Sequence, residues 1–140
     1  MSTRKKPKVD IRAARIEDVP EIARLIEPYV RQRMLLPRSV EELRDLTRNG
    51  FAAESDGRIV GFAAVEIYSK KLAEVQCLAV AAGYQRRGIG KLLVEACVRC
   101  AREHDILELM AITASDQFLR ECGFDYSLPD QKRALFINTR

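Results

Sequence analysis

Residues 83–92 read GYQRRGIGKL and join an expected strand to an expected helix. Before it, LAEVQCLAV (72–80) has the apolar content of a strand. After it, GIGKLLVEACVRCARE (88–103) repeats apolar residues every three or four positions, as an amphipathic helix does. A strand-to-helix turn brings the unpartnered N–H groups of the first helical turn and the positive end of the helix dipole to one place. The stretch therefore predicts a backbone site for an anion, above all a phosphate.

The residues of the turn itself strengthen this expectation. Gly88 and Gly90 remove side chains that would block a close approach to the backbone, and Arg86 and Arg87 add positive charge beside it. The turn is not the phosphate loop of nucleoside triphosphatases, because the Gly-Lys-Ser/Thr ending is missing. It is also not a dinucleotide-binding fingerprint, because Leu93 stands where the third glycine would be.

The rest of the sequence predicts one domain of mixed helices and strands. Asp56-Gly57 between two apolar runs is a strong β-hairpin signal, Asp18 is the expected cap of the first helix, and Ser39 with Glu42 forms a capping box for the second. An antiparallel meander followed by a strand–helix–strand crossover implies a mixed sheet. The expected elements are strands at 9–14, 51–55, 58–68 and 72–80, a buried strand at 106–112, a last strand pair at 124–126 and 133–138, and helices at 14–34, 40–49, 88–103 and 114–122.

The composition is that of an ordinary globular domain of 140 residues. Four of the 24 basic side chains lie in residues 1–8, a tail expected to be disordered, so the domain expected over 9–140 carries 20 basic and 20 acidic side chains. A neutral body without a basic stripe argues against nucleic acid as a partner. No apolar run is long enough to span a membrane, and without a secretion signal a cytoplasmic protein with reduced cysteines is expected.

Two further side-chain patterns are expected to be structural. Cys97 and Cys100 are spaced as half of a metal or redox site, but both fall on the apolar stripe of a helix, which favours core packing. His104 lies near the end of the same helix, where a basic ring compensates the helix dipole. No metal is therefore expected.

Gln85–Gly90 resembles the Q/R-x-x-G-x-G/A motif of the GNAT family of N-acetyltransferases. FLRECGF (118–124) resembles a second segment of that family, F-Y/F-x-x-x-G-F, and the expected order of elements is also the family's. The resemblance covers nearly the whole chain beyond residue 8. It implies an α/β, acyl-CoA N-acyltransferase fold with a central, mostly antiparallel mixed sheet and helices on both faces.

The resemblance also implies a co-substrate and its contacts. In the family the backbone amides of the motif hold the pyrophosphate of acetyl-CoA, and the pantetheine arm lies where the strand before the motif parts from the strand that follows it. The matching positions here are Leu78, Ala79, Val80, Gln85, Arg86, Arg87, Gly88, Ile89, Gly90 and Lys91.

Acetyl transfer from a thioester to an amine needs a base, a donor for the thioester oxygen and a proton for the thiolate. Glu74 is a carboxylate inside an otherwise apolar strand and is the candidate base, although it also fits an edge residue in water. A backbone N–H near Leu78 is the natural donor. Many members use a tyrosine of the second segment as the acid, but this chain has Phe118-Leu119 there. Ser115 or Thr113 is then the candidate, and either equally fits a helix cap.

A narrower resemblance concerns the amine. LLPRSVEEL (35–43) and AEVQCLAVAAGYQRRGIGKLL (73–93) are similar to the acetyltransferase domain of N-acetylglutamate synthases, in its short single-domain form. This implies L-glutamate as substrate, with its carboxylates gripped by Arg38 and by Arg133 or Arg140, because arginine pairs with carboxylates bidentately. Each arginine also fits a solvated residue. The resemblance further implies a homodimer. Acetylation of a protein amine, or a non-catalytic CoA-binding module, stays open.

Overall fold

The computed structural model describes residues 8–113, 116–128 and 134–139, so most of the expected basic tail lies outside the described residues. The strands are β1 (Asp10–Ala13), β2 (Gly50–Ser55), β3 (Arg58–Ile67), β4 (Leu72–Val80) and β5 (Glu108–Met110). The helices are α1 (Val19–Arg31), α2 (Val40–Thr47), α3 (Ile89–Glu103) and α4 (Asp116–Glu121), with short 3-10 turns at Ile16–Asp18 and Ala82–Tyr84.

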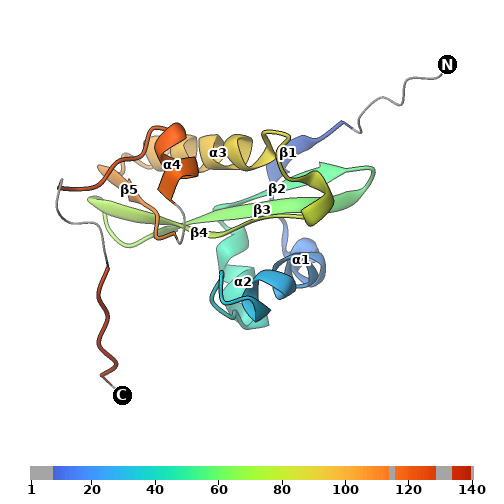
Figure 1. Ribbon diagram of the computed structural model, residues 1–140, viewed down its shortest axis with the longest axis horizontal. Coiled ribbons are helices and arrows are strands. Elements are labelled where there is room, and N and C mark those ends of the chain that lie inside the picture. Colours follow the sequence, from blue (N-terminus) through green and yellow to red (C-terminus); the bar gives the residue numbers. More distant parts are fainter. Residues whose placement is uncertain (1–7, 114–115, 129–133, 140) are drawn as a thin grey trace.

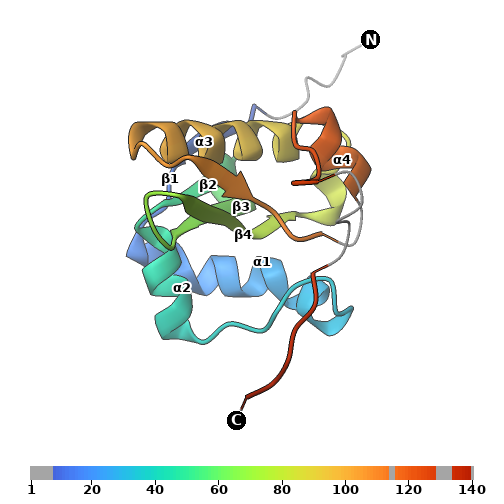
Figure 2. The ribbon, with the colours of Figure 1, turned by 90° about the vertical axis from the view of Figure 1, so that its left-hand side faces the viewer.

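The five strands form one mixed sheet in the order β1-β2-β3-β4-β5. All neighbours are antiparallel except β4 and β5, which are parallel. Helices α1 and α2 cover one face of the sheet, and α3 and α4 lie on the other (Figure 1, Figure 2). The expected α/β fold is confirmed, as are the order of the first nine elements and the antiparallel meander. No helix in the described ranges is long and apolar enough to cross a membrane.

The hairpin between β2 and β3 turns at the predicted dipeptide. Asp56 and Gly57 have φ angles of 50° and 74°, the left-handed values that a two-residue hairpin turn requires at both central positions. Ser55 and Arg58 face each other as the last pair before the turn. This turn fixes which face of β3 each residue occupies, because a slip of one residue would reverse every side chain.

A bulge interrupts β4 at Cys77, three residues before the strand ends at Val80. Phe62 of β3 is opposite Ala79, and Ala64 is opposite Gln76, so β4 holds one residue more than β3 between these pairs. Cys77 takes up the difference with a φ of 56°. The side chains of Gln76 and Cys77 consequently point to the same layer, that of α1 and α2. Sequence reasoning did not predict this bulge.

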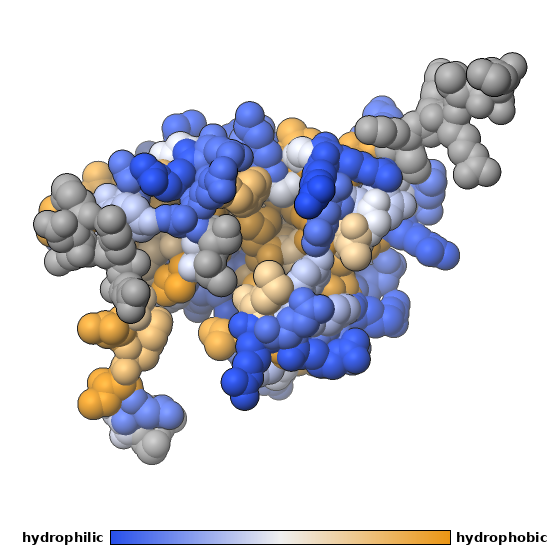
Figure 3. All heavy atoms as spheres, viewed as in Figure 1, coloured by the Kyte–Doolittle hydropathy of each residue, from blue (hydrophilic) through white to orange (hydrophobic). Residues whose placement is uncertain are grey.

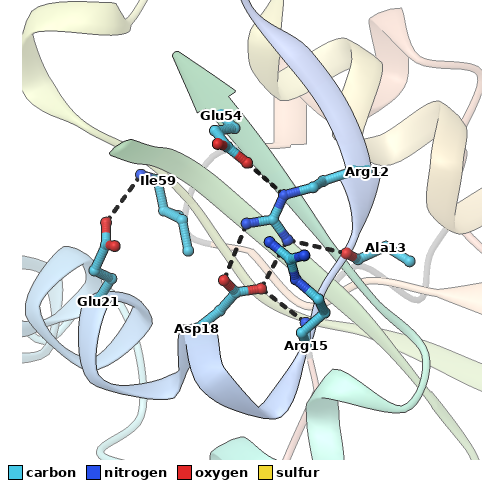
Figure 4. Close-up of polar contacts among 7 residues, drawn as sticks. All are labelled: Arg12, Ala13, Arg15, Asp18, Glu21, Glu54 and Ile59. Atoms are coloured by element: carbon cyan, nitrogen blue, oxygen red, sulfur yellow. Dashed lines mark hydrogen bonds and ion pairs between the residues drawn. The ribbon is translucent and has the colours of Figure 1, made fainter. Parts of the chain in front are cut away.

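The N-terminus of α1 is held by a cluster of charged side chains (Figure 4). Arg12 of β1 donates to both carboxylate oxygens of Asp18, at 2.8 and 3.0 Å, and to Glu54 of β2 at 2.5 Å. Asp18 also accepts from the backbone N–H of Arg15 at 2.7 Å, but its side chain makes no capping bond to α1, which corrects the expected cap. The carboxylate is drawn to the 3-10 turn because the guanidinium lies there. Glu21 links α1 to β3 by accepting from the N–H of Ile59.

The capping box of α2 is confirmed. The Ser39 hydroxyl accepts from the N–H of Glu42 at 3.1 Å, and the Glu42 carboxylate accepts from the N–H of Ser39 at 3.2 Å. These bonds lower the pKa of Glu42. Since the box fixes where α2 begins, it also fixes the position of Arg38, the residue just before it.

Three expectations about the C-terminal half are wrong. The expected buried strand at 106–112 is the short β5, with Leu107 and Ile112 74% and 52% exposed. Neither 124–126 nor the described part of 133–138 forms a strand. The apolar run at 135–137 supplied a strand-like pattern, but no described strand pairs with residues 134–139, and a strand needs a neighbouring strand to form. Leu92, expected on the core stripe of α3, is 43% exposed.

Candidate active site

The turn before α3 has the geometry expected of an anion site. Gly88 precedes α3 with a φ of 78°, and nothing lies within 4 Å of the position that a side chain would take there. The N–H of Leu92 bonds to the carbonyl of Gly88, so the N–H groups of the three residues before Leu92 precede the hydrogen-bond ladder of the helix. Gly90 has a different reason: a Cβ there would lie 3.2 Å from the ring of Phe118, so this glycine serves the packing of α4 on α3 rather than ligand approach.

The charged residues of the turn lie on its outer surface. Arg86 is exposed with a φ of 64°, and Arg87 lies with its guanidinium 5.0 Å from the ring centre of Tyr84. Tyr84 is half-buried against the core beneath α3. Ile89 is buried in the same core, so its backbone rather than its side chain is available to a ligand.

The end of β4 is fixed to α1 by Tyr29. The Tyr29 hydroxyl donates to the carbonyl of Val80, and Gln85 donates through Nε2 to the Tyr29 oxygen at 2.7 Å and to the Val80 carbonyl at 3.3 Å. The predicted motif residue Gln85 therefore anchors its own loop. The Val80 carbonyl therefore already accepts two hydrogen bonds.

The hydrogen bonds at the end of β4 show which edge of the strand the main-chain N–H and C=O groups of Leu78 face. The N–H of Ala81 bonds to Val60 of β3, whereas the carbonyl of Val80 points away from β3 to Tyr29. Because alternate residues of a strand direct their N–H and C=O groups to the same edge, Leu78 directs both groups to the edge that Val80 faces. Ala79 bonds toward β3 and its side chain is buried.

That edge of β4 opens where β5 leaves it. The two strands pair only at Leu72–Glu74 with Glu108–Met110, while β4 continues to Val80 (Figure 2). Hydrophobic residues gather in the middle of this side of the molecule, between the charged outer surfaces of the two helical layers (Figure 3). Strands that separate in this way leave main-chain groups free to pair with an extended ligand.

Glu74 lies in a polar cluster with Tyr68, a residue that was not predicted from the sequence to belong to the site. The Tyr68 hydroxyl donates to Glu74 Oε1 at 2.5 Å and lies 3.4 Å from Glu66 Oε2, and Gln76 Nε2 donates to the Tyr68 oxygen at 3.3 Å. Burial, followed by the hydrogen bond to Glu74, raises the pKa of Tyr68 well above its ordinary value. The signal for Tyr68 lies in the pairing of β3 with β4. A turn at 69–71 puts Glu66 opposite Glu74, and Tyr68 follows Glu66 by two residues, on the same face.

Arg38 joins the same cluster from the other side. Its guanidinium donates to Gln76 Oε1 and lies 3.7 Å from Glu42, and its side chain is only 14% exposed. Arg38 opposes the rise that burial produces in the pKa of Cys77. Arg38 also borders a hollow of about 360 Å³ between α2 and the end of β3, whose walls are formed by Arg38, Glu42, Asp45, Leu46, Arg48, Asn49, Val65, Glu66 and Ile67.

The remaining predicted site residues are not placed near Glu74 or Arg38 by the described structure. Ser115, Arg133 and Arg140 lie outside the described residues. Lys91 is exposed on the first turn of α3.

The cysteines and the histidine have the structural places expected of them. Cys97 and Cys100 are buried, and burial raises the pKa of Cys97 to about 12. His104 Nδ1 lies 2.8 Å from the carbonyl of Cys100, at the C-terminus of α3. Among the described residues no three His, Cys, Asp or Glu side chains are grouped as a metal site would need.

A phosphate-type turn, an open strand edge and a carboxylate beside it are thus arranged along one strand. A model of the acetyltransferase (GNAT) family matches residues 16–124. The chain belongs to this family. It is an N-acetyltransferase, and the family expected from residues 85–90 and 118–124 is confirmed.

Relatives of this acetyltransferase include proteins named as N-acetyltransferases and as amino-acid acetyltransferases. An uncharacterized N-acetyltransferase of Chlorobaculum tepidum is 34% identical over 81% of this chain and 74% of its own. The amino-acid acetyltransferase of Pasteurella multocida is 33% identical over 88% of this chain, but over only 29% of its own. The chain thus spans under a third of the length of the amino-acid acetyltransferase that it matches.

Solved structures agree with the fold. Rv2747 of Mycobacterium tuberculosis, in complex with CoA, superposes with a TM-score of 0.77 at 26% identity, over 81% of this chain and 70% of its own. N-acetylglutamate synthase of Neisseria gonorrhoeae, complexed with coenzyme A and N-acetyl-glutamate, superposes with a TM-score of 0.75 at 34% identity, over 84% of this chain and 28% of its own.

Proposed function

We propose that this acetyltransferase transfers the acetyl group of acetyl-CoA to the α-amino group of an amino acid, L-glutamate. Acetyl-CoA as donor follows from the family, and related structures contain CoA. The amino acid is the finer part of the proposal. Relatives named amino-acid acetyltransferase, and a structural neighbour complexed with N-acetyl-glutamate, support it. The observation that carries it is the position of Arg38 at the edge of a hollow, with a link to Glu74 through Gln76 and then Tyr68.

The hollow offers a shielded cation for a carboxylate of the amino acid. Arg38 is largely shielded from solvent, so an ion pair with a carboxylate there is stronger than one on the open surface. Arg48 lines the same hollow and is the second cation within it, although it also pairs with Asp45 at 3.8 Å. Arg133 and Arg140 stay candidates for the second carboxylate.

The strand edge supplies the other requirements of the reaction. Acetyl-CoA, when bound, supplies the acetyl group as a thioester. The turn from Gln85 to Lys91 would hold its pyrophosphate through main-chain N–H groups, and the edge at Leu78 would pair with its extended arm. The N–H of Leu78 is the donor proposed for the thioester oxygen. Glu74 is proposed to take the proton that the amine loses. Ser115 remains the candidate that returns a proton to the thiolate.

The proposal is tested by an amine screen. Purified protein with acetyl-CoA should release thiol with L-glutamate and show much slower release with L-glutamine, L-lysine or a lysine peptide. Mass spectrometry should identify N-acetylglutamate as the product. Release with none of the free amino acids, but with a peptide amine, would overturn the amino-acid assignment and leave acetyl transfer intact.

Arg38→Lys is the sharper test of the carboxylate site. Lysine keeps the charge but loses the planar fork, so KM for glutamate should rise about tenfold or more. KM for acetyl-CoA should stay unchanged because the phosphate turn lies elsewhere. Arg31→Lys, an exposed arginine of α1, is the matched control. Equal effects of the two substitutions would contradict a role for Arg38.

A cationic amine is the second candidate substrate. Three carboxylates line the hollow, Glu42, Asp45 and Glu66, against two arginines, so its formal charge is negative. A polyamine or a lysine side chain would be attracted by such walls. Spermidine and lysine peptides therefore belong in the screen, and their turnover should fall when salt is raised.

A further inference from the structure

We propose that Tyr68 positions Glu74 for proton transfer, and that it is the last donor of a one-way chain of hydrogen bonds that begins at Arg38. The inference rests on the proposed role of Glu74 as base. The chain runs from Arg38 to Gln76 Oε1, from Gln76 Nε2 to the Tyr68 oxygen, and from the Tyr68 hydroxyl to Glu74 Oε1.

The direction of this chain is set by chemistry. Arginine carries donors only, so Gln76 must turn its amide oxygen toward Arg38, and its NH₂ group is thereby left to face Tyr68. Because the Tyr68 oxygen accepts that bond, its single proton is free for a carboxylate. Of the two carboxylates nearby, Glu74 is closer by almost 1 Å, at 2.5 Å against 3.4 Å for Glu66.

Glu74 therefore ends the chain as an acceptor. Its second oxygen, Oε2, accepts no hydrogen bond from any residue in the described part of the chain, so it is free to meet an amine. Tyr68 cannot readily lose its proton, since burial and Glu74 both raise its pKa. It is consequently a positioning residue, and it passes no proton itself.

The arrangement also separates two like charges. Glu66 and Glu74 are directly opposite each other in the β3–β4 ladder, which by itself is unfavourable. The Tyr68 hydroxyl lies between them and bonds to one. Among the described residues, charged groups facing this cluster include Arg38, from the segment before α2, and Glu42 of α2, while Asp45 and Arg48 line the hollow together with Glu66.

Tyr68→Phe tests the inference. Tyr68 is 51% exposed and phenylalanine keeps the shape of the ring, so the fold is expected to survive, as a melting curve would check. Loss of one hydrogen bond to a charged group should lower kcat about tenfold, with KM for acetyl-CoA unchanged. The acidic limb of the kcat–pH profile should move to higher pH, because a carboxylate without its donor is protonated more readily. A purely structural role would not move that limb.

The double variant makes the test specific. Glu74→Gln alone should lower kcat about a hundredfold or more, and Tyr68→Phe should add nothing in that background, because Tyr68 acts through Glu74. Glu17→Gln, an exposed glutamate near α1, controls for loss of one carboxylate. Additive effects, or an unmoved pH profile in Tyr68→Phe, would overturn the inference while leaving Glu74 as base. Full activity of Glu74→Gln, with loss in Glu66→Gln, would overturn both.

Discussion

Single side chains in this acetyltransferase act through the partners that the fold gives them. Asp18 is 7% exposed and yet charged, and this is possible because Arg12 reaches both of its oxygens. The bond to Arg12 lowers the pKa of Asp18, and the reciprocal bond raises the pKa of Arg12. A buried charge with such a partner tolerates neither the loss of that partner nor its own neutralisation.

Asp18→Asn should reduce the free energy of unfolding by about 2 kcal/mol at pH 7. The folded-state pKa of Asp18 lies below its unfolded value, so its contribution is complete above the unfolded pKa and is lost as pH falls through the folded one. The difference between wild type and variant should accordingly shrink below about pH 4. Urea unfolding at several pH values measures it.

Asp10→Asn is the matched control for this prediction. Asp10 lies on the same strand as Arg12, but its side chain is 71% exposed and its ion pair with Lys8 spans 3.9 Å. Exposed pairs of this kind contribute little, so stability should change by less than about 0.5 kcal/mol. A pH-independent loss in Asp18→Asn would mean that Asp18 stabilises the fold as a neutral group.

Among the strands and helices, the β2–β3 hairpin depends on backbone conformation rather than on contacts. Gly57 has a φ of 74° and nothing within 4 Å of a modest side chain, so Gly57→Ala should cost about 1 kcal/mol through strain alone. Gly83 is equally open but lacks a positive φ, and Gly83→Ala should be neutral or slightly stabilising. Thermal melting of the two variants distinguishes the effect of a positive φ from the effect of the space available to a side chain. Equal melting temperatures would contradict the argument.

Elements with a local signal were predictable, and elements that depend on distant partners were not. The hairpin, the α2 capping box and α3 carry their signals within a few residues, so their positions follow from the sequence. The length of β5 depends on where β4 leaves it, and residues 134–139 depend on a neighbouring strand. The bulge at Cys77 has no signal in its own residue type. For the same reason Glu74 could be selected as a candidate, whereas Tyr68 required the register of β3 on β4.

For the whole molecule, the edge of β4 beyond β5 is the proposed place of the ligand between the two helical layers, and binding there should raise the free energy of unfolding. Acetyl-CoA at 100 times its Kd should add about 2.7 kcal/mol to the free energy of unfolding, and raise Tm by several degrees. Pantetheine, which lacks the phosphates, should raise Tm much less, because the turn from Gln85 to Gly90 would have nothing to hold. Equal shifts with both compounds would place the main contact on the strand edge instead of the turn.

The extra residue in β4 has a consequence for how this architecture tolerates change. In an unbroken strand, positions an even number apart share both face and edge. The side chains of Glu74 and Leu78 would then lie on the same face of the sheet, and their main-chain groups would point to the same neighbouring strand. The bulge breaks this parity: the carboxylate faces α2, and the Leu78 amide turns to the open side. Loss of one residue at Cys77 would undo both placements at once. Under the proposed roles of Glu74 and Leu78, the interval from Glu74 to Gln85 therefore tolerates no change of length.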